Sequence, residues 1–275
     1  MTALQAIFLA VVQGITELFP ISSLAHAVLA PAILGWNIDE NADSFLPFLV
    51  VMHLGTALAL LLYFWRDWLS FATAVLFRRG PRAESERRIF WRVVVATIPV
   101  VIVGFLLEKP LRHAFGSPVL AAGILIANGA MLFAAERMRG RQGRALSRLR
   151  WIDAVTIGLW QCLALIPGFS RSGATMAGGY LAGLDHEDAA RFSFLTATPV
   201  IIAAAVLETP KMLKAHDHFS SVAVLAGVVA GVVAFLSTVA LMRWFKQTEV
   251  RAFDPFAIYC ALAGAGSLAW LLLRH

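Results

Sequence analysis

The chain has 275 residues, of which 59% are hydrophobic and only 15% are charged, and its mean hydropathy is +0.75. Soluble domains carry about a quarter charged residues, so this composition excludes an ordinary soluble enzyme. The formal net charge of +6 is compatible with nucleic-acid binding, but the basic residues lie between apolar runs, as in membrane proteins with positively charged cytoplasmic loops. We therefore expect one membrane domain, residues 1–275, with no nucleic-acid partner and no removable signal peptide.

Two apolar stretches, 3–35 and 152–184, are each broken in the middle by proline and small polar residues. Their arms of about 12–17 residues are mostly shorter than the roughly 20 residues needed to cross a bilayer. We predict that both stretches form re-entrant helix–break–helix hairpins.

Six further runs are long enough to cross the membrane, with some snorkelling at their ends: 46–65, 92–107, 118–136, 192–207, 221–243 and 256–273. Arginines cluster in 66–92 and 137–150, whereas 37–45 is acidic. This alternation predicts that the arginine-rich loops are cytoplasmic and that both termini lie outside.

The two breaks resemble each other, since each has a glutamine, a proline six or seven residues later and a serine-containing turn: QGITELFPISSLAH at 13–26 and QCLALIPGFSRSGAT at 161–175. Each is followed by three predicted spans, and an odd number gives the two halves opposite orientations. The expected fold is therefore an all-α polytopic membrane protein with six spans and two re-entrant hairpins. Residues 1–150 and 151–275 would form an inverted-topology repeat, whose broken helices meet near the midplane.

The first break gathers the components of an activated nucleophile. Gln13 and Glu17 are four residues apart and share a helix face, and Ser23 and His26 are three apart on the next arm. Ionisable residues inside a membrane usually mark function. Two plainer interpretations stay open: Ser22 as only a helix cap, and Glu17 as a satisfied packing residue.

The second break has the composition of a phosphate cradle. Helix-start N–H groups bind anions, and the planar guanidinium of Arg171 matches phosphate oxygens. Hydroxyl and backbone donors would come from Ser170, Ser172, Gly173 and Thr175. An arginine at this depth is costly, which favours a functional role for Arg171 over a structural one.

The remaining polar groups favour plainer roles. His53 is expected to be structural or to line a pore, and the arginine clusters to set topology. Cys162 and Cys260 lie in apolar runs without a CxxC neighbour, so neither a disulfide nor a zinc site is expected.

On these residues the chain resembles the undecaprenyl-diphosphatase, or bacitracin-resistance, family over nearly its whole length, through QGITELFPISSLAH and PGFSRSGAT. The resemblance implies hydrolysis of undecaprenyl diphosphate, a lipid carrier for cell-wall synthesis, on the outer face of the bacterial inner membrane. It assigns catalytic positions to Glu17, Ser23, His26 and Arg171. It also implies a divalent cation, Mg²⁺ or Ca²⁺, which we expect Glu17 and Gln13 to hold, and it leaves a homodimer open.

At two positions the chain departs from the family pattern. Leu24 stands where a further hydroxyl is common, and Leu49 stands where an acidic residue is expected four positions before His53. Each leucine removes a helper group but leaves the core group of Glu17, Ser23, His26 and Arg171 unchanged. We therefore expect an effect on efficiency or metal affinity rather than on the type of reaction.

Two other functions compete. A membrane acid phosphatase needs SRxxxxxH, but Ala177 stands where that motif has histidine. A lipid-phosphate flippase or transporter would share the inverted repeat, yet it would not need the hydroxyl, carboxylate and imidazole of the first break. Which of Ser23 and His26 is the nucleophile stays open, with Ser23 as the first choice and His26 as its proton acceptor.

Overall fold

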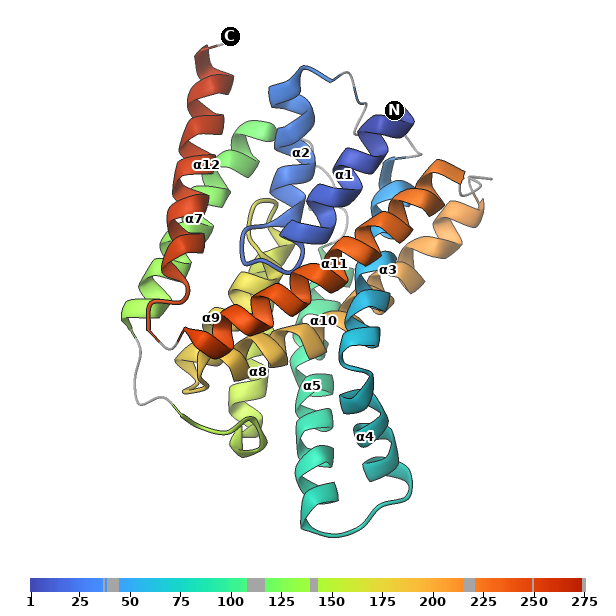
Figure 1. The fold of residues 1–275 in the computed structure, drawn as a ribbon, viewed down its shortest axis with the longest axis vertical. Helices are drawn as coiled ribbons and strands as arrows, with labels where there is room; N and C mark the ends of the chain where they lie inside the picture. Colours follow the sequence, from blue (N-terminus) through green and yellow to red (C-terminus); the bar gives the residue numbers. More distant parts are fainter. Residues whose placement is uncertain are drawn as a thin grey trace.

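The computed structural model describes residues 1–36, 38, 45–107, 117–138, 143–214, 221–248 and 250–273. Within these ranges the protein is all-helical, with eleven α-helices and two short 3₁₀ helices. Both chain termini lie at one end of the molecule, and the α4–α5 turn and η1 lie at the other (Figure 1). Most of the acidic stretch 37–45 falls outside the described residues.

The first broken stretch forms two short helices, α1 (Ala3–Thr16) and α2 (Ser23–Leu34). The Thr2 side chain starts α1 through a capping box with Gln5. Ser22 caps α2 by accepting a hydrogen bond from the Ala25 N–H at 3.2 Å. At 1.5 Å per residue, these helices extend only about 20 Å, less than the roughly 30 Å hydrocarbon core.

The predicted span 46–65 is only partly correct. The chain forms α3 (Phe45–Tyr63) and then bends by 71° into α4 (Trp65–Leu76). Most of the arginine-rich segment that follows is also helical, in α5 (Pro81–Leu106). This helix begins at a proline, a residue that is favoured in the first helical turn. Ion pairs one turn apart, such as Glu84 with Arg88, support this polar start.

Four further long helices complete the set: α7 (Pro118–Arg137), α10 (His186–Lys214), α11 (Ser221–Gln247) and α12 (Asp254–Leu273). Among the described residues, five helices are long and apolar enough to cross a membrane, or six if the bent α3–α4 pair counts as one. The chain is therefore a multi-pass membrane protein.

The second broken stretch comprises α8 (Trp151–Gln161), the 3₁₀ helix η2 (Cys162–Leu165) and α9 (Arg171–Leu181), and η1 (Leu146–Arg148) precedes it. Gly168 turns the chain at a φ of 108°, where other residues are strained. A Cβ at Gly168 would also lie 2.8 Å from the Ala121 carbonyl oxygen on α7. Glycine is therefore required here both for the turn and for the close packing of the break on α7. Cys162 and Cys260 are both free thiols.

Helix α11 holds the first hairpin against the rest of the molecule. α11 packs against α1 and α3. A Cβ at Gly14 would lie 2.7 Å from the Ala230 carbonyl oxygen, and one at Gly55 would overlap the Gly227 carbonyl. Such small residues let membrane helices approach backbone to backbone. The two breaks lie near the middle of the molecule (Figure 1).

A second buried polar cluster joins the ends of α7 and α9 to the start of α10 and to the turn before α12. The Glu136 carboxylate accepts hydrogen bonds from the Tyr180 hydroxyl at 3.1 Å and from the Phe253 N–H at 3.0 Å. The His186 ring lies 2.9 Å from the same carboxylate. These bonds fix the turn before α12, and so the position of α12 relative to the two breaks.

Candidate active site

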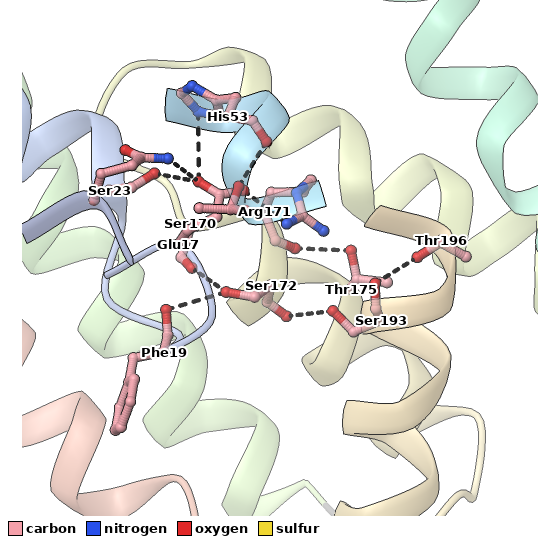
Figure 2. A network of polar contacts seen from close by, with 12 residues as sticks. Glu17, Phe19, Ser23, His53, Ser170, Arg171, Ser172, Thr175, Ser193 and Thr196 are labelled. Carbon is pink, nitrogen blue, oxygen red and sulfur yellow. Dashed lines mark hydrogen bonds and ion pairs between the residues drawn. The ribbon is translucent and has the colours of Figure 1, made fainter. Parts of the chain in front are cut away.

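Glu17 is the centre of the polar network between the two breaks (Figure 2). Its Oε2 accepts hydrogen bonds from the Ser23 hydroxyl at 2.6 Å and from Gln13 Nε2 at 3.1 Å. Its Oε1 accepts from Arg171 Nη2 at 2.7 Å, and His53 Nε2 lies 3.5 Å from Oε2. The sequence predicted that Glu17, Ser23, His26 and Arg171 meet. The structure brings Glu17, Ser23 and Arg171 together and adds Gln13 and His53.

Arg171 neutralises the buried Glu17 carboxylate through one guanidinium nitrogen, and a second nitrogen has no partner among the described residues. The side chains of Glu17 and Arg171 are only 6% and 12% exposed, and an unpaired charge at such a site would be costly. Arg171 Nη1 is buried without a hydrogen-bond partner in the described part of the chain. Leaving such a donor unpaired costs about 1–3 kcal/mol, so this nitrogen points to a site for an anionic ligand.

The hydroxyl groups of the second break are mostly occupied. Ser170 caps α9 by accepting from the Gly173 N–H at 3.1 Å, and Thr175 donates to the Arg171 carbonyl at 2.7 Å. Ser172 donates to the Phe19 carbonyl at 3.1 Å and so ties this break to the first one. The N–H groups of Arg171 and Ser172, at the first two helical positions, have no acceptor within α9.

Asn128 on α7 is a site residue that sequence reasoning missed. Its Nδ2 donates to the Pro20 carbonyl at 2.9 Å, and its Oδ1 accepts from the Ser170 N–H at 3.0 Å. The two partners, one acceptor and one donor, fix the orientation of the amide. Asn128 is fully buried and links the two breaks directly. The signal in the sequence was an amide inside an apolar span, where polar side chains commonly join helices.

His26 lies beside this network rather than in it. Its Nδ1 is 2.7 Å from the Ser22 carbonyl, and its Nε2 is 2.7 Å from the Tyr259 hydroxyl on α12. The sequence predicted that His26 accepts the Ser23 proton, but here the Ser23 hydroxyl donates to Glu17. The reason is local. The Ser22 carbonyl, four residues earlier, binds Nδ1 of the imidazole, so Nε2 faces α12.

Comparison with known proteins shows the family of the chain. A model of the bacitracin resistance protein BacA family matches residues 6–266. The chain belongs to this family. It is 53% identical to an undecaprenyl-diphosphatase of Acidiphilium cryptum over 276 residues, covering 98% of both chains. It is 52% identical to one of Granulibacter bethesdensis, over 98% of this chain and 97% of that protein. An undecaprenyl-diphosphatase 2 of Chromobacterium violaceum is 44% identical over 99% of this chain and 100% of that protein.

One departure from the expected BacA-family pattern has a clear structural setting. The Leu49 side chain is buried in an apolar cluster with Phe48 and Met52, so a carboxylate there would be desolvated. The Leu49 carbonyl is 2.8 Å from His53 Nδ1, and this contact turns the other ring nitrogen toward Glu17. His53 is thus part of the site's polar network, where the sequence favoured a structural or pore-lining role.

The BacA-family site has no ready-made cage for a metal ion among the residues that the structure describes. These residues contain no group of three or more His, Cys, Asp or Glu side chains placed to hold one. Ca²⁺ takes six to eight oxygen ligands, whereas Mg²⁺ commonly binds through one or two carboxylates together with substrate phosphates. In the structure Gln13 turns its Nε2 toward Glu17, so Glu17 is the carboxylate of this network that could contact a cation.

Proposed function

We propose that this membrane protein is an undecaprenyl-diphosphatase, which hydrolyses undecaprenyl diphosphate to undecaprenyl phosphate and inorganic phosphate. Relatives of that name match it over 97–98% of their length. The observation that carries the proposal is the contact of buried Glu17 with half-buried Ser23 and Arg171, which combines a base, a hydroxyl and an unsatisfied guanidinium donor.

The terminal phosphate would bind at the start of α9. Arg171 keeps Nη2 on Glu17 and directs the unpaired Nη1 to a phosphate oxygen, in the fork geometry that guanidinium provides. The N–H groups of Arg171 and Ser172 add backbone donors at a helix N-terminus. Ser22, Ser170, Gly173 and Thr175 shape this subsite, mainly by holding the two helix starts in place.

The reaction would proceed in two displacements. Ser23 Oγ attacks the terminal phosphorus, the phosphoanhydride bond breaks, and undecaprenyl phosphate leaves with the electron pair. The Ser23 proton passes to Glu17, which already accepts it in a 2.6 Å hydrogen bond. Water then attacks the phosphoserine, and His26 Nε2 accepts the water proton. The Ser23 Oγ–P bond breaks, inorganic phosphate leaves, and Glu17 returns its proton to Ser23 Oγ. In the alternative scheme, His26 is the nucleophile and Ser23 binds phosphate.

A divalent cation belongs to this proposal. Glu17, with Gln13, would hold Mg²⁺ together with the diphosphate oxygens. When bound, the ion would neutralise charge on the phosphates, which is the main requirement of phosphoryl transfer.

We also propose the finer topology: two inverted halves, 1–150 and 151–275, in the bacterial inner membrane with the site open to the outer face. Helix packing supports the repeat. Helix α1 packs on α11, and its counterpart α8 in the second half packs on α5. In the same way α3 packs on α11, and its counterpart α10 packs on α5. The α4–α5 turn, which lies in the arginine-rich segment 66–92, is at the end of the molecule opposite the termini (Figure 1). This supports a cytoplasmic position for that end.

The prenyl chain would lie in an apolar groove of about 600 Å³ between α3 and α11. Its wall includes Leu54, next to His53 of the site, and the exposed Leu58. Leu58→Trp should fill the groove and raise the KM for the long-chain substrate roughly threefold or more, with little change for farnesyl diphosphate. Leu262→Trp on the exposed face of α12 is the control. Equal effects on both substrates would contradict this position for the chain.

Phosphate release by the purified protein tests the function. Detergent-solubilised protein with undecaprenyl diphosphate and Mg²⁺ should release inorganic phosphate, and Ser23→Ala should not. Ser267→Ala, a buried serine on α12 outside the network, is the matched control and should retain activity. A lipid-phosphate flippase would move substrate across vesicles but release no phosphate, so that result would favour the transporter alternative.

A further inference from the structure

Tyr259 connects the last helix of the chain to the first break. Its hydroxyl lies 2.7 Å from His26 Nε2, and the two rings stack with centroids 5.7 Å apart and planes 10° apart. The adjacent Cys260 thiol lies 3.8 Å from the Pro20 carbonyl and 3.3 Å from Asn128 Nδ2. Successive residues of α12 therefore contact both the turn of the first break and the imidazole that follows it.

The partners of His26 determine where its proton lies. A backbone carbonyl can only accept a hydrogen bond, so the 2.7 Å contact with Ser22 requires a hydrogen on Nδ1. In the neutral imidazole Nε2 then carries a lone pair, and the Tyr259 hydroxyl donates to it. The nitrogen that would accept a proton or attack phosphorus is thus the one that faces Tyr259.

We propose that Tyr259 is a positioning residue for the reaction: its hydroxyl and ring hold His26 with Nε2 unprotonated and aimed at the place where the reacting water or phosphate will stand. This inference rests on the proposed function, but it holds whether His26 acts as base or nucleophile. When a phosphate oxygen or a water replaces the tyrosine hydroxyl, His26 Nε2 already points toward it.

The arrangement makes catalysis depend on contact between distant parts of the chain. His26 belongs to the first break, whereas Tyr259 is 233 residues further on, on a helix packed along α7. The tyrosine is 43% exposed, so a water or phosphate oxygen can replace its hydroxyl beside His26 without disturbing buried packing. Removing that hydroxyl should therefore change the behaviour of His26 without unfolding the protein.

The test uses Tyr259→Phe, which keeps the stacked ring and removes only the hydroxyl. We expect kcat for phosphate release to fall about tenfold, as for a misoriented proton acceptor, with KM within about twofold of its original value. Tyr63→Phe removes a hydroxyl from a tyrosine in an aromatic cluster on α3 and should leave kcat unchanged.

A second readout follows His26 itself. Diethyl pyrocarbonate reacts with unprotonated imidazole nitrogen, and peptide mass spectrometry reports the labelling rate at each histidine. Tyr259→Phe should label His26 several times faster, while labelling of His53 stays the same. Unchanged kcat or unchanged His26 labelling in Tyr259→Phe would overturn the inference, as would an equal loss in Tyr63→Phe. A native protein that released no phosphate would instead refute the proposed function, and the labelling comparison would still report on the contact.

Discussion

Asn128→Ala would remove the amide that holds the two breaks together. The Ser170 N–H would lose its partner on α7, and the Pro20 carbonyl would keep only the weak contact with the Cys260 thiol at 3.8 Å. Each buried polar group left unpaired costs about 1–3 kcal/mol, so the free energy of unfolding should fall by roughly 2–6 kcal/mol. The two breaks carry Glu17 and Arg171, so the same loss should loosen the site.

Two measurements should move together. The thermal midpoint in detergent should fall by about 5 °C or more. Phosphate release at a temperature where the variant is still folded should fall about 100-fold, because a shift of about 1 Å in the reacting groups has that order of effect. Thr97→Val is the control, since Thr97 donates only to Val93 of its own helix. A variant with unchanged midpoint and turnover would show that Asn128 does not hold the breaks.

Three further outcomes are expected. Arg171→Lys keeps the charge but loses the fork, so phosphate release should fall at least about tenfold; full activity would remove the reason for placing phosphate at Arg171. Trapping with labelled substrate should give a phosphoserine at Ser23, and a phosphohistidine at His26 isolated from Ser23→Ala would instead establish the alternative nucleophile. Cysteines introduced at Asp39 and Arg141, both outside the described residues, should label with a membrane-impermeant reagent from outside only at Asp39, and the reverse pattern would invert the proposed orientation.

The sequence by itself determined the class of protein and the location of its chemistry. Apolar runs of about 20 residues leave little choice but membrane-spanning helices, since backbone groups in lipid must bond within the helix. Prolines at 20 and 167 disfavour a continuous helix. The small polar residues that follow them identified these positions as breaks, whereas Pro31 and Pro99 lie inside helices. A carboxylate and an arginine at membrane depth are costly unless they pair or serve a function, and Glu17 and Arg171 do form an ion pair.

The bend between α3 and α4 was not visible in the same way. Hydropathy reports composition along a run, and it does not distinguish a straight span from one that turns by 71° at Phe64. The arginine-rich segment was predicted to be a loop because charge signals contact with water, yet a helix such as α5 can begin outside the lipid on ion-paired turns.

Only the tertiary structure decided which groups meet. Sequence spacing places Ser23 and His26 on one face of α2, but it does not show that Ser23 turns back to Glu17 while His26 faces Tyr259. Asn128 joins residues 108 and 42 positions away, a pairing that no local pattern contains. Such contacts depend on how α7 and α12 pack around the breaks. Helix packing is set by the shape of whole surfaces, and neighbouring residues in the sequence carry little information about it.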